Sequence, residues 1–495
     1  MAETLTMLLF CAALFISVGF GWSIIPALLI GALLFFGYGL IRKVPLRNMV
    51  VHAAGSVRTT STVLGTFVLI GLLTSLWRAS GTIAYIVTYA ITVIHHVTVL
   101  PLSFLLCSGM SVLTGSSFAS AATMGTICMS LGLTMGANPM ILGGAILAGV
   151  YVGDRCSPVS TSALLVAQLT HTNLFNNLGR MVRTGAIPFA LSCLTYVAVA
   201  IADSSGSHYG SLSSAMHSSA ATGSPTATAD ATDIAALFSS AFHLHWLTVL
   251  PAIVVIVLAL IRVDVRLIMF ASIIVSTAIC IGVQGMGLRD LVDLLVFGYH
   301  SKNPQVALLL DGGGMASMLT VMVIVCISAA YSGIFAQTHM LDRLQLAISS
   351  MAGRVGTVTA TVITAVGAAM LACNQTLAIM LTHQLCASLY RRDAAHDDGK
   401  RRNAGTVDDD RNSAVSTGDE GASTDDDGRA RLALAIEDSA VVIAPLVPWA
   451  IASAVPLATI NAPTSSLFAA VFLFFVPLSR IAGELVTRKT ASVLR

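Results

Sequence analysis

Charged residues are scarce in this chain and are gathered in one segment. Of its 495 residues, 56% are hydrophobic and 10% are charged, whereas soluble globular proteins carry roughly 25% charged residues. Nineteen of the 50 charged residues lie between Arg391 and Arg431. The rest cannot cover a water-soluble surface of this size, but a bundle facing the lipid bilayer does not need them. We therefore expect an all-α polytopic membrane protein, and we exclude nucleic-acid binding, a soluble secreted enzyme and general disorder.

Apolar runs recur along the whole sequence and predict about 11–13 transmembrane helices, some discontinuous or re-entrant. Two mixed segments, 45–60 and 286–303, are expected to lie along the membrane interface. The first run has no basic residues ahead of it, so we interpret it as a span and not a signal peptide. The predicted spans are 5–22, 24–41, 61–77, 81–98, 99–113, 139–153, 184–201, 243–261, 265–284, 316–338, 355–372, 440–460 and 463–483.

Two loops and a coarse repeat divide the chain. Residues 202–232 lack Lys and Arg and form a low-complexity loop, which the basic residues of the short loops place outside the cytoplasm. Residues 391–431 alternate basic and acidic clusters and are predicted to be disordered. We expect a multi-pass protein of the plasma (inner) membrane, and the sequence leaves a homodimer open. The predicted units are 1–60 (first spans and interfacial helix), 61–201 (first repeat), 202–232 (loop), 233–315 (connecting spans) and 316–495 (second repeat with the charged loop).

Very few acids lie in or beside the predicted spans, and these are the candidate site residues. An ionised acid in hydrocarbon costs at least about 2.5–3.5 kcal/mol, so such a residue normally faces water or a partner. Asp154 fits this description, although it could instead pair with Arg155 or mark a helix end. Glu437 and Asp438 fit it too, although they could equally form a charged helix start. Asp154 and Asp438 are our candidate Na⁺ ligands.

Hydroxyl and amide groups cluster where the apolar runs are interrupted. Around Asp154, Pro158 disfavours helix and leaves nearby carbonyls free, in a segment that a plain turn would also explain. A carboxylate, hydroxyls and free carbonyls are hard oxygen ligands suited to Na⁺ or a proton relay. The other breaks offer amides that need a partner, either a helix or a substrate, or small residues that also suit close helix packing. The candidate residues at these breaks are Thr114, Ser116, Ser117, Ser157, Ser160, Thr161, Asn374, Gln375 and Ser439.

The same kinds of break occur in both predicted repeats. Thr114–Ser117 in the first corresponds to Asn374–Thr376 in the second, and each repeat continues to an acid, a serine and a proline. Paired broken segments are typical of transporters built from inverted repeats. We find no Walker A loop, no catalytic triad and no zinc motif. We therefore expect a transporter and not an enzyme, with no cofactor.

These motifs resemble those of the NhaC family of Na⁺/H⁺ antiporters. The segment from Gly153 to Ser160 resembles the family's Gly-Asp-Lys/Arg-x-Ser-Pro-x-Ser signature, and Glu437-Asp438-Ser439 with Pro445–Trp449 resembles its Glu-Asp-Ser/Thr…Leu-Ile-Pro-Trp segment. The Thr114–Ser117 and Gln375–Ile379 segments are similar to its other two breaks. The resemblance implies two inverted repeats and a central site exposed alternately to the two sides of the membrane.

The chain also departs from the family pattern. Thr161 and Asn374 stand where the family typically has acids, Ala450 replaces an Asn, and the family's Asn near Ala163 is not matched. We accordingly predict Na⁺/H⁺ exchange, with Asp154 binding either ion in turn and Asp438 or Glu437 assisting. The alternative is a cation-coupled permease or exchanger for a small organic solute, such as an amino acid or a carboxylate, which the amides and hydroxyls could hold.

Overall fold

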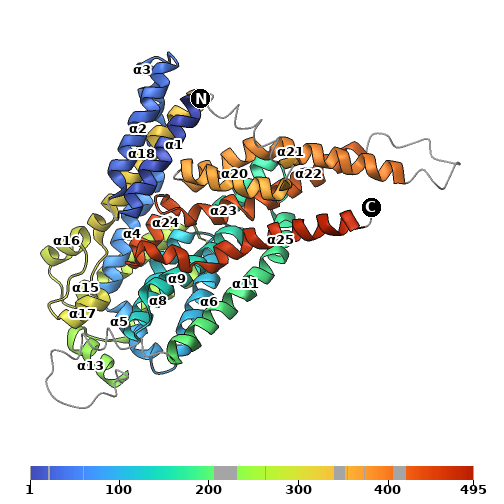
Figure 1. The fold of residues 1–495 in the computed structure, drawn as a ribbon. Helices are drawn as coiled ribbons and strands as arrows, with labels where there is room; N and C mark the ends of the chain where they lie inside the picture. Colours follow the sequence, from blue (N-terminus) through green and yellow to red (C-terminus); the bar gives the residue numbers. More distant parts are fainter. Residues whose placement is uncertain are drawn as a thin grey trace.

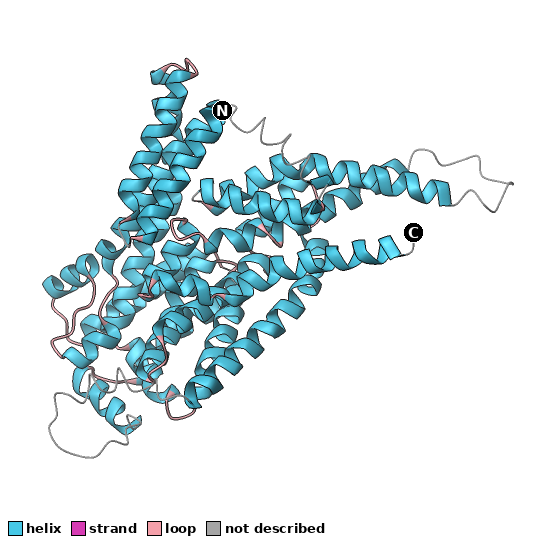
Figure 2. Ribbon diagram, viewed as in Figure 1, coloured by secondary structure: helices cyan, strands magenta, loops and turns pink. Residues whose placement is uncertain are grey.

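The chain folds into helices throughout the part that the structure describes. This computed structural model describes residues 2–20, 23–59, 61–205, 231–261, 263–338, 352–353, 355–372, 374–404 and 420–493. Within these ranges the only β-structure is an isolated bridge between Tyr299 and Gly312 (Figure 2). The expected all-α fold is confirmed.

The helices of the first part run from the N-terminus to a 32-residue helix, α11. They are α1 (Ala2–Gly19), α2 (Ile24–Ile41), α3 (Leu46–Thr59), α4 (Ser61–Ala79), α5 (Thr82–Ala90), α6 (His96–Thr114), α7 (Ser117–Ser120), η1 (Ala121–Gly125), α8 (Thr126–Thr134), α9 (Pro139–Cys156), α10 (Thr161–Thr170) and α11 (Leu174–Ser205).

The remaining helices include the connecting spans and the second predicted repeat. They are α13 (Ala231–Ala241), η3 (Trp246–Val249), α14 (Leu250–Leu260), α15 (Val265–Gly282), α16 (Leu288–Phe297), α17 (Pro304–Leu310), α18 (Gly314–Thr338), α20 (Thr357–Ala372), α21 (Gln375–Ala404), α22 (Glu420–Glu437), α23 (Ala440–Ile443), η4 (Ala444–Leu446), α24 (Ile451–Ile460), η5 (Thr464–Ala469) and α25 (Val471–Val493).

Several apolar runs are broken or bent and do not form straight spans. By length and composition, four described helices can each cross a membrane alone, and counting three bent pairs as one span each raises the number to seven. The predicted span 81–98 is wrong as a single helix, because α5 ends at Ala90 and α6 begins at His96. The predicted span 440–460 is also wrong, because its two helical parts meet at a bend of 54°. The total of 11–13 spans stays a prediction.

The charged segment 391–431 is more helical than its composition predicted. Helix α21 continues to Ala404 and α22 begins at Glu420, so the predicted disorder is wrong for both flanks. Residues 405–419 and most of the predicted loop 202–232, namely 206–230, lie outside the described residues. The two mixed segments contain the short helices α3 and α16, and their position along the membrane interface stays a prediction.

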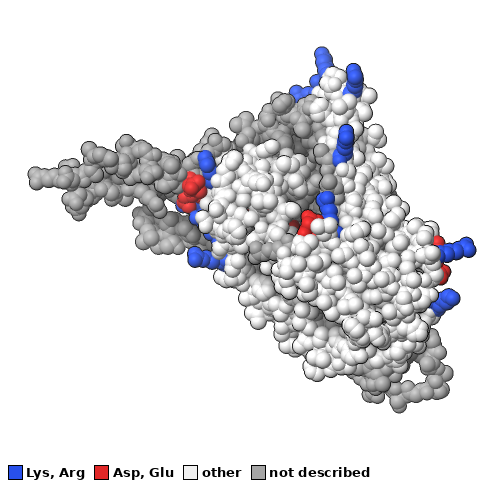
Figure 3. All heavy atoms as spheres, turned by 180° about the vertical axis from the view of Figure 1, so that it is seen from behind, with Lys and Arg blue, Asp and Glu red and all other residues white. Residues whose placement is uncertain are grey.

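The outer surface is apolar, as a lipid-facing surface must be. Charged side chains are few over the face in Figure 3 and lie mostly near its margins. On α11, Ile187 and Leu194 are 68% and 63% exposed, although both are large and apolar. Such exposure in water would mark an interaction site, and in a multi-pass membrane protein it marks contact with lipid.

Helix α9, which carries Asp154, packs closely against other helices in the middle of the molecule. Helices α6, α8 and α9 lie between the long α11 and the α1–α2–α18 group, and α20, α21 and α22 lie together on one side (Figure 1). Helix α9 packs directly on α6 through two glycines. A Cβ atom on Gly153 would lie 2.0 Å from the backbone of Ser111, and one on Gly149 would lie 2.6 Å from the carbonyl oxygen of Phe104. Small residues allow this approach of two backbones.

Candidate functional site

The first predicted repeat contains two helix breaks that touch each other. Helix α6 ends at Thr114 and is followed by Gly115, whose φ of 64° suits a residue without a side chain. Ser116 then caps α7 by accepting a hydrogen bond from the Ala119 amide at 3.3 Å. A Cβ atom on Gly115 would lie 2.6 Å from the carbonyl carbon of Val159, which belongs to the second break. The two breaks therefore pack backbone against backbone.

The second break follows Asp154 and is braced by two serines. Pro158 prevents continuation of α9, and Ser160 caps α10 by accepting a hydrogen bond from the Ala163 amide at 3.2 Å. The Ser157 hydroxyl donates to the carbonyl of Val112 at 2.7 Å, and the Ser160 hydroxyl donates to the backbone carbonyl of Asp154. Both serines thus fix the shape of the break, and neither hydroxyl faces an open space.

The second predicted repeat shows a similar pair of breaks. Asn374 lies between α20 and α21, and its side-chain oxygen accepts from the Thr376 amide at 2.8 Å. The next residue, Gln375, donates from Nε2 to the carbonyl of Val441 at 3.1 Å. Val441 belongs to α23, which follows the break at Asp438 and Ser439. In both parts of the chain the earlier break therefore contacts the region of the later one.

Asp154 lies where the two parts of the chain meet. Its carboxylate oxygen Oδ2 accepts hydrogen bonds from Ser162 Oγ at 3.1 Å and from Gln375 Nε2 at 2.9 Å. One donor comes from α10 and the other from α21, 221 residues away along the chain. Asp154 is only 4% exposed. The anticipated pair with Arg155 is not formed, because that guanidinium is bound elsewhere.

A cavity of about 420 Å³ opens beside the Asp154 carboxylate. Six of the twelve predicted site residues line it, together with three further polar residues and an apolar wall. The predicted residues are Ser116, Ser117, Asp154, Thr161, Asn374 and Gln375; the further polar residues are Ser162, Gln168 and Thr376; the apolar wall includes Phe118, Leu164, Leu165 and Ile451.

The other six predicted residues do not line this cavity. Thr114 bonds to the carbonyl of Met110 at 3.0 Å and to Ser120 Oγ at 2.9 Å, which stabilises the first break. Ser439 donates to the carbonyl of Ala435 at 2.5 Å. Ser157 and Ser160 brace the second break. Asp438 lies in a separate, buried ionic cluster, and Glu437 lies next to that cluster.

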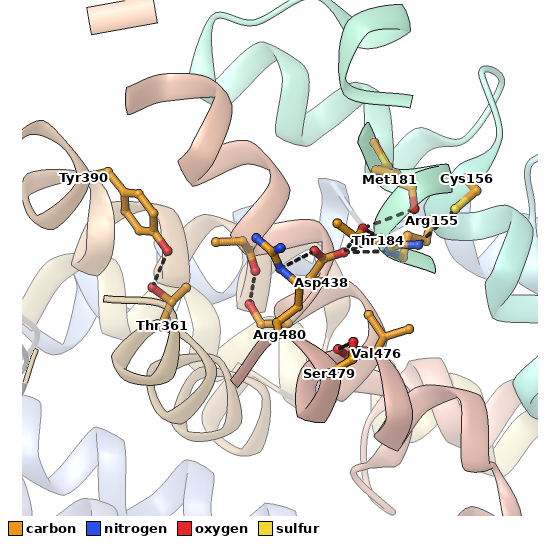
Figure 4. Close-up of polar contacts among 12 residues, drawn as sticks. Arg155, Cys156, Met181, Thr184, Thr361, Tyr390, Asp438, Val476, Ser479 and Arg480 are labelled. Carbon is orange, nitrogen blue, oxygen red and sulfur yellow. Dashed lines mark hydrogen bonds and ion pairs between the residues drawn. The ribbon is translucent and has the colours of Figure 1, made fainter. Parts of the chain in front are cut away.

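This cluster joins α9, α11 and α25 to the end of α22 (Figure 4). Arg155 donates from Nε to Asp438 Oδ1 at 3.1 Å, makes a second bond to it from Nη2, and also donates from Nη2 to Thr184 Oγ1 at 2.7 Å. Arg480 Nε lies 3.0 Å from the other oxygen, Asp438 Oδ2. The carboxylate of Asp438 is thus engaged by two arginines in this structure, and the expectation that it supplies oxygens to Na⁺ stays a prediction.

Glu437 behaves differently from its neighbour. It is the last residue of α22, it is fully buried, and neither carboxyl oxygen has a hydrogen-bond partner in the described part of the chain. The expected direct help of this acid at Asp154 is not seen, because Gln375 is the residue from the second part that reaches Asp154.

The sequence motifs identified the acids of the site, but they did not identify the residues that bind those acids. Arg480 and Thr184 complete the ionic cluster, and their segments carry no local sign of this because Asp438 lies 254 residues from Thr184. Ser162 had a visible signal, since it is one of four hydroxyls that follow Asp154 within a few residues.

An all-α membrane protein with a buried carboxylate at crossed helix breaks belongs to the class of secondary transporters. The chain is a member of the Na⁺/H⁺ antiporter family, which it matches over residues 2–176 and 149–397. This confirms the family that the motifs indicated.

Three curated relatives show the range of this similarity. The Na⁺/H⁺ antiporter NhaC of Alkalihalophilus pseudofirmus is 22% identical over 83% of this chain and 79% of its own length. The malate-2H⁺/Na⁺-lactate antiporter of Bacillus subtilis is 25% identical over 77% of this chain and 75% of its own. The arginine/ornithine antiporter ArcD of Halobacterium salinarum is 24% identical over 60% of this chain and 58% of its own.

Proposed function

We propose that this protein is a Na⁺/H⁺ antiporter of the plasma membrane and that Asp154 binds the two ions in turn. The observation that carries the proposal is the position of Asp154, a buried carboxylate beside the cavity and at the contact between the two parts of the chain. No other acid lines this cavity in the described residues. Membership of the antiporter family supports the same conclusion.

Competition at one carboxylate couples the two fluxes. The Asp154 carboxylate can hold either a proton or a Na⁺ ion, so the arrival of one requires the departure of the other. Hydroxyl oxygens of Ser116, Ser117, Thr161 and Ser162 are hard ligands that can share the coordination of Na⁺. Gln375 offers Asp154 its amide N–H, so it orients the carboxylate. The ion gradients drive this exchange, which needs no cofactor and no nucleotide.

Exchange in proteoliposomes tests the proposal. An inwardly directed Na⁺ gradient should collapse an imposed pH gradient with an acidic vesicle interior, because Na⁺ entry expels H⁺, and it should fail to do so in Asp154→Asn. The matched control is Asp264→Asn, which removes an exposed carboxylate that only caps α15. Normal exchange by Asp154→Asn, with correct insertion shown, would remove Asp154 from the mechanism.

A second candidate function follows from the size of the cavity. A space of about 420 Å³ with an apolar wall is much larger than a Na⁺ ion requires. The single carboxylate would attract a positively charged group, so a small amine-bearing solute fits this cavity better than a carboxylate does. Two of the relatives are named as antiporters of organic solutes.

Uptake of labelled amines, amino acids and carboxylates separates the two functions. An organic-solute exchanger should accumulate one of these compounds in an Asp154-dependent manner, and that compound should compete with Na⁺. A Na⁺/H⁺ antiporter should transport none of them, and its exchange should be unaffected by their presence.

A further inference from the structure

Glu437, the buried acid next to the ionic cluster, has no role in ion exchange at Asp154. We propose that Glu437 is a second proton-binding site, which carries a proton in this conformation and exchanges it during the transport cycle. The role in transport rests on the proposed antiport at Asp154, whereas the presence of the proton does not.

Burial without partners favours the protonated form of Glu437. The side chain is 0% exposed, and neither oxygen accepts a hydrogen bond from the described residues. An ionised carboxylate in such a place loses its hydration and gains nothing in return, which costs several kcal/mol, so the group stays neutral instead. Glu484 shows the contrast, because its carboxylate accepts three hydrogen bonds from Val358 and Thr359.

The neighbouring charges do not stabilise an ionised Glu437. The cation within reach is Arg155 of α9, and its guanidinium is already bound to Asp438 and Thr184. Two negative charges, those of Asp438 beside it and Asp154 on α9, act on Glu437 as well. The thiol of Cys156, also on α9, is the remaining titratable group that its charge would affect. A proton on Glu437 relieves the repulsion among the three acids.

A buried acid that makes no bond adds nothing to the stability of this conformation. Methionine would fill a similar space without burying polar atoms that lack a partner, and ionisable groups inside membrane proteins are normally functional. Glu437 ends α22 at a helix break that packs against α10 and α9. A rearrangement of these broken segments, as alternating access requires, would bring water to the carboxyl group and let its proton leave as hydronium.

Infrared spectroscopy of the purified protein tests for this proton directly. The chain has four glutamates, Glu3, Glu420, Glu437 and Glu484, so labelling glutamate with a heavy carbon isotope marks few groups. We expect a protonated-carboxyl band that shifts with this label, persists in saturating Na⁺ and disappears in Glu437→Gln. The control Glu484→Gln should keep the band. A labelled protein without such a band, or a Glu437→Gln variant that retains it, would overturn the proposal.

Exchange of the proton during turnover is tested separately. In proteoliposomes in heavy water, a Na⁺ gradient should convert the Glu437 band to its deuterated form, and Asp154→Asn, which blocks the cycle, should leave it unchanged. If the wild type exchanges Na⁺ while the Glu437 band does not shift to its deuterated position, Glu437 has a structural role and does not exchange its proton during transport. If Na⁺ drives no proton flux at all, the proposed antiport fails, although the labelled band of the idle protein would still be present. The labelled wild type decides the question even if Glu437→Gln does not fold.

Discussion

At the scale of single residues, the environment of Asp154 explains how one acid could serve two ions. Its Oδ2 atom accepts two hydrogen bonds, from Ser162 and Gln375, and the cavity lies beside it. Donors of this kind favour the charged carboxylate, which is the form that binds Na⁺. Burial at 4% exposure favours the neutral form, which is the form that holds a proton. The balance of these two effects lets either ion occupy the site.

Removal of the Gln375 amide should weaken the binding of Na⁺ relative to protons. A hydrogen bond to a charged group contributes about 1.5–3 kcal/mol, so we expect Gln375→Met to raise the Na⁺ concentration for half-maximal exchange by about tenfold or more at fixed pH. The control is Gln168→Met, because Gln168 lines the same cavity but forms no hydrogen bond to Asp154 in the structure. Equal effects of the two substitutions would show that Gln375 acts through cavity polarity alone.

Local sequence patterns can identify individual site residues, but they cannot identify the long-range contacts between these residues. Asp154 stands out in the sequence because an acid in an apolar run is costly, and Gln375 stands out because an amide in an apolar run needs a partner. No local sequence pattern indicates that Gln375 forms a hydrogen bond to Asp154, or that Arg480 forms an ion pair with Asp438. These contacts join segments hundreds of residues apart, and they depend on how the helices pack.

At the scale of elements, the helix breaks were predictable and the helices beyond them were not. Gly115, Pro158 and Asn374 interrupt helices through backbone conformation or a missing donor, so each break is visible in the sequence. The helix α10 was not predicted, because it is shorter than a membrane span. The charged ends of α21 and α22 were not predicted either, because highly charged sequences usually lack the apolar face that stabilises a helix.

Contact between the first two breaks predicts a strong effect of a single methyl group. Gly115→Ala places a Cβ atom 2.6 Å from the backbone at Val159, at a residue whose φ is 64°. The left-handed conformation alone costs about 1–2 kcal/mol for a residue with a side chain, and the close contact adds to it. We expect a lower melting temperature in detergent and slower exchange.

The matched control lies in the same helix. Gly109 of α6 has no atom within 4 Å of a Cβ position, so Gly109→Ala should preserve stability and transport. If both variants melt like the wild type, the two breaks are not packed together as described.

At the scale of the whole molecule, the Arg155–Asp438–Arg480 cluster ties the two predicted repeats together. Its arginines come from α9 and α25, and its acid follows α22. Arg155 and Asp438 are almost completely buried. Because a buried charge that loses its partner is costly, about 3–5 kcal/mol, the cluster holds these helices in one arrangement. It also keeps Arg155 away from its neighbour Asp154, which stays available to a transported cation.

Asp438→Asn should therefore destabilise the protein, and its effect on Na⁺ should be indirect. We expect a loss of about 3–5 kcal/mol in the free energy of unfolding, since Arg155 would be left buried without an ionised partner. Adding Arg155→Gln to this variant should recover part of the loss, because the unpaired charge is then gone. The control is Asp427→Asn, which breaks an exposed pair with Arg431 and should cost less than about 1 kcal/mol. A stable Asp438→Asn protein that no longer binds Na⁺ would instead make Asp438 an ion ligand and return it to the transport site.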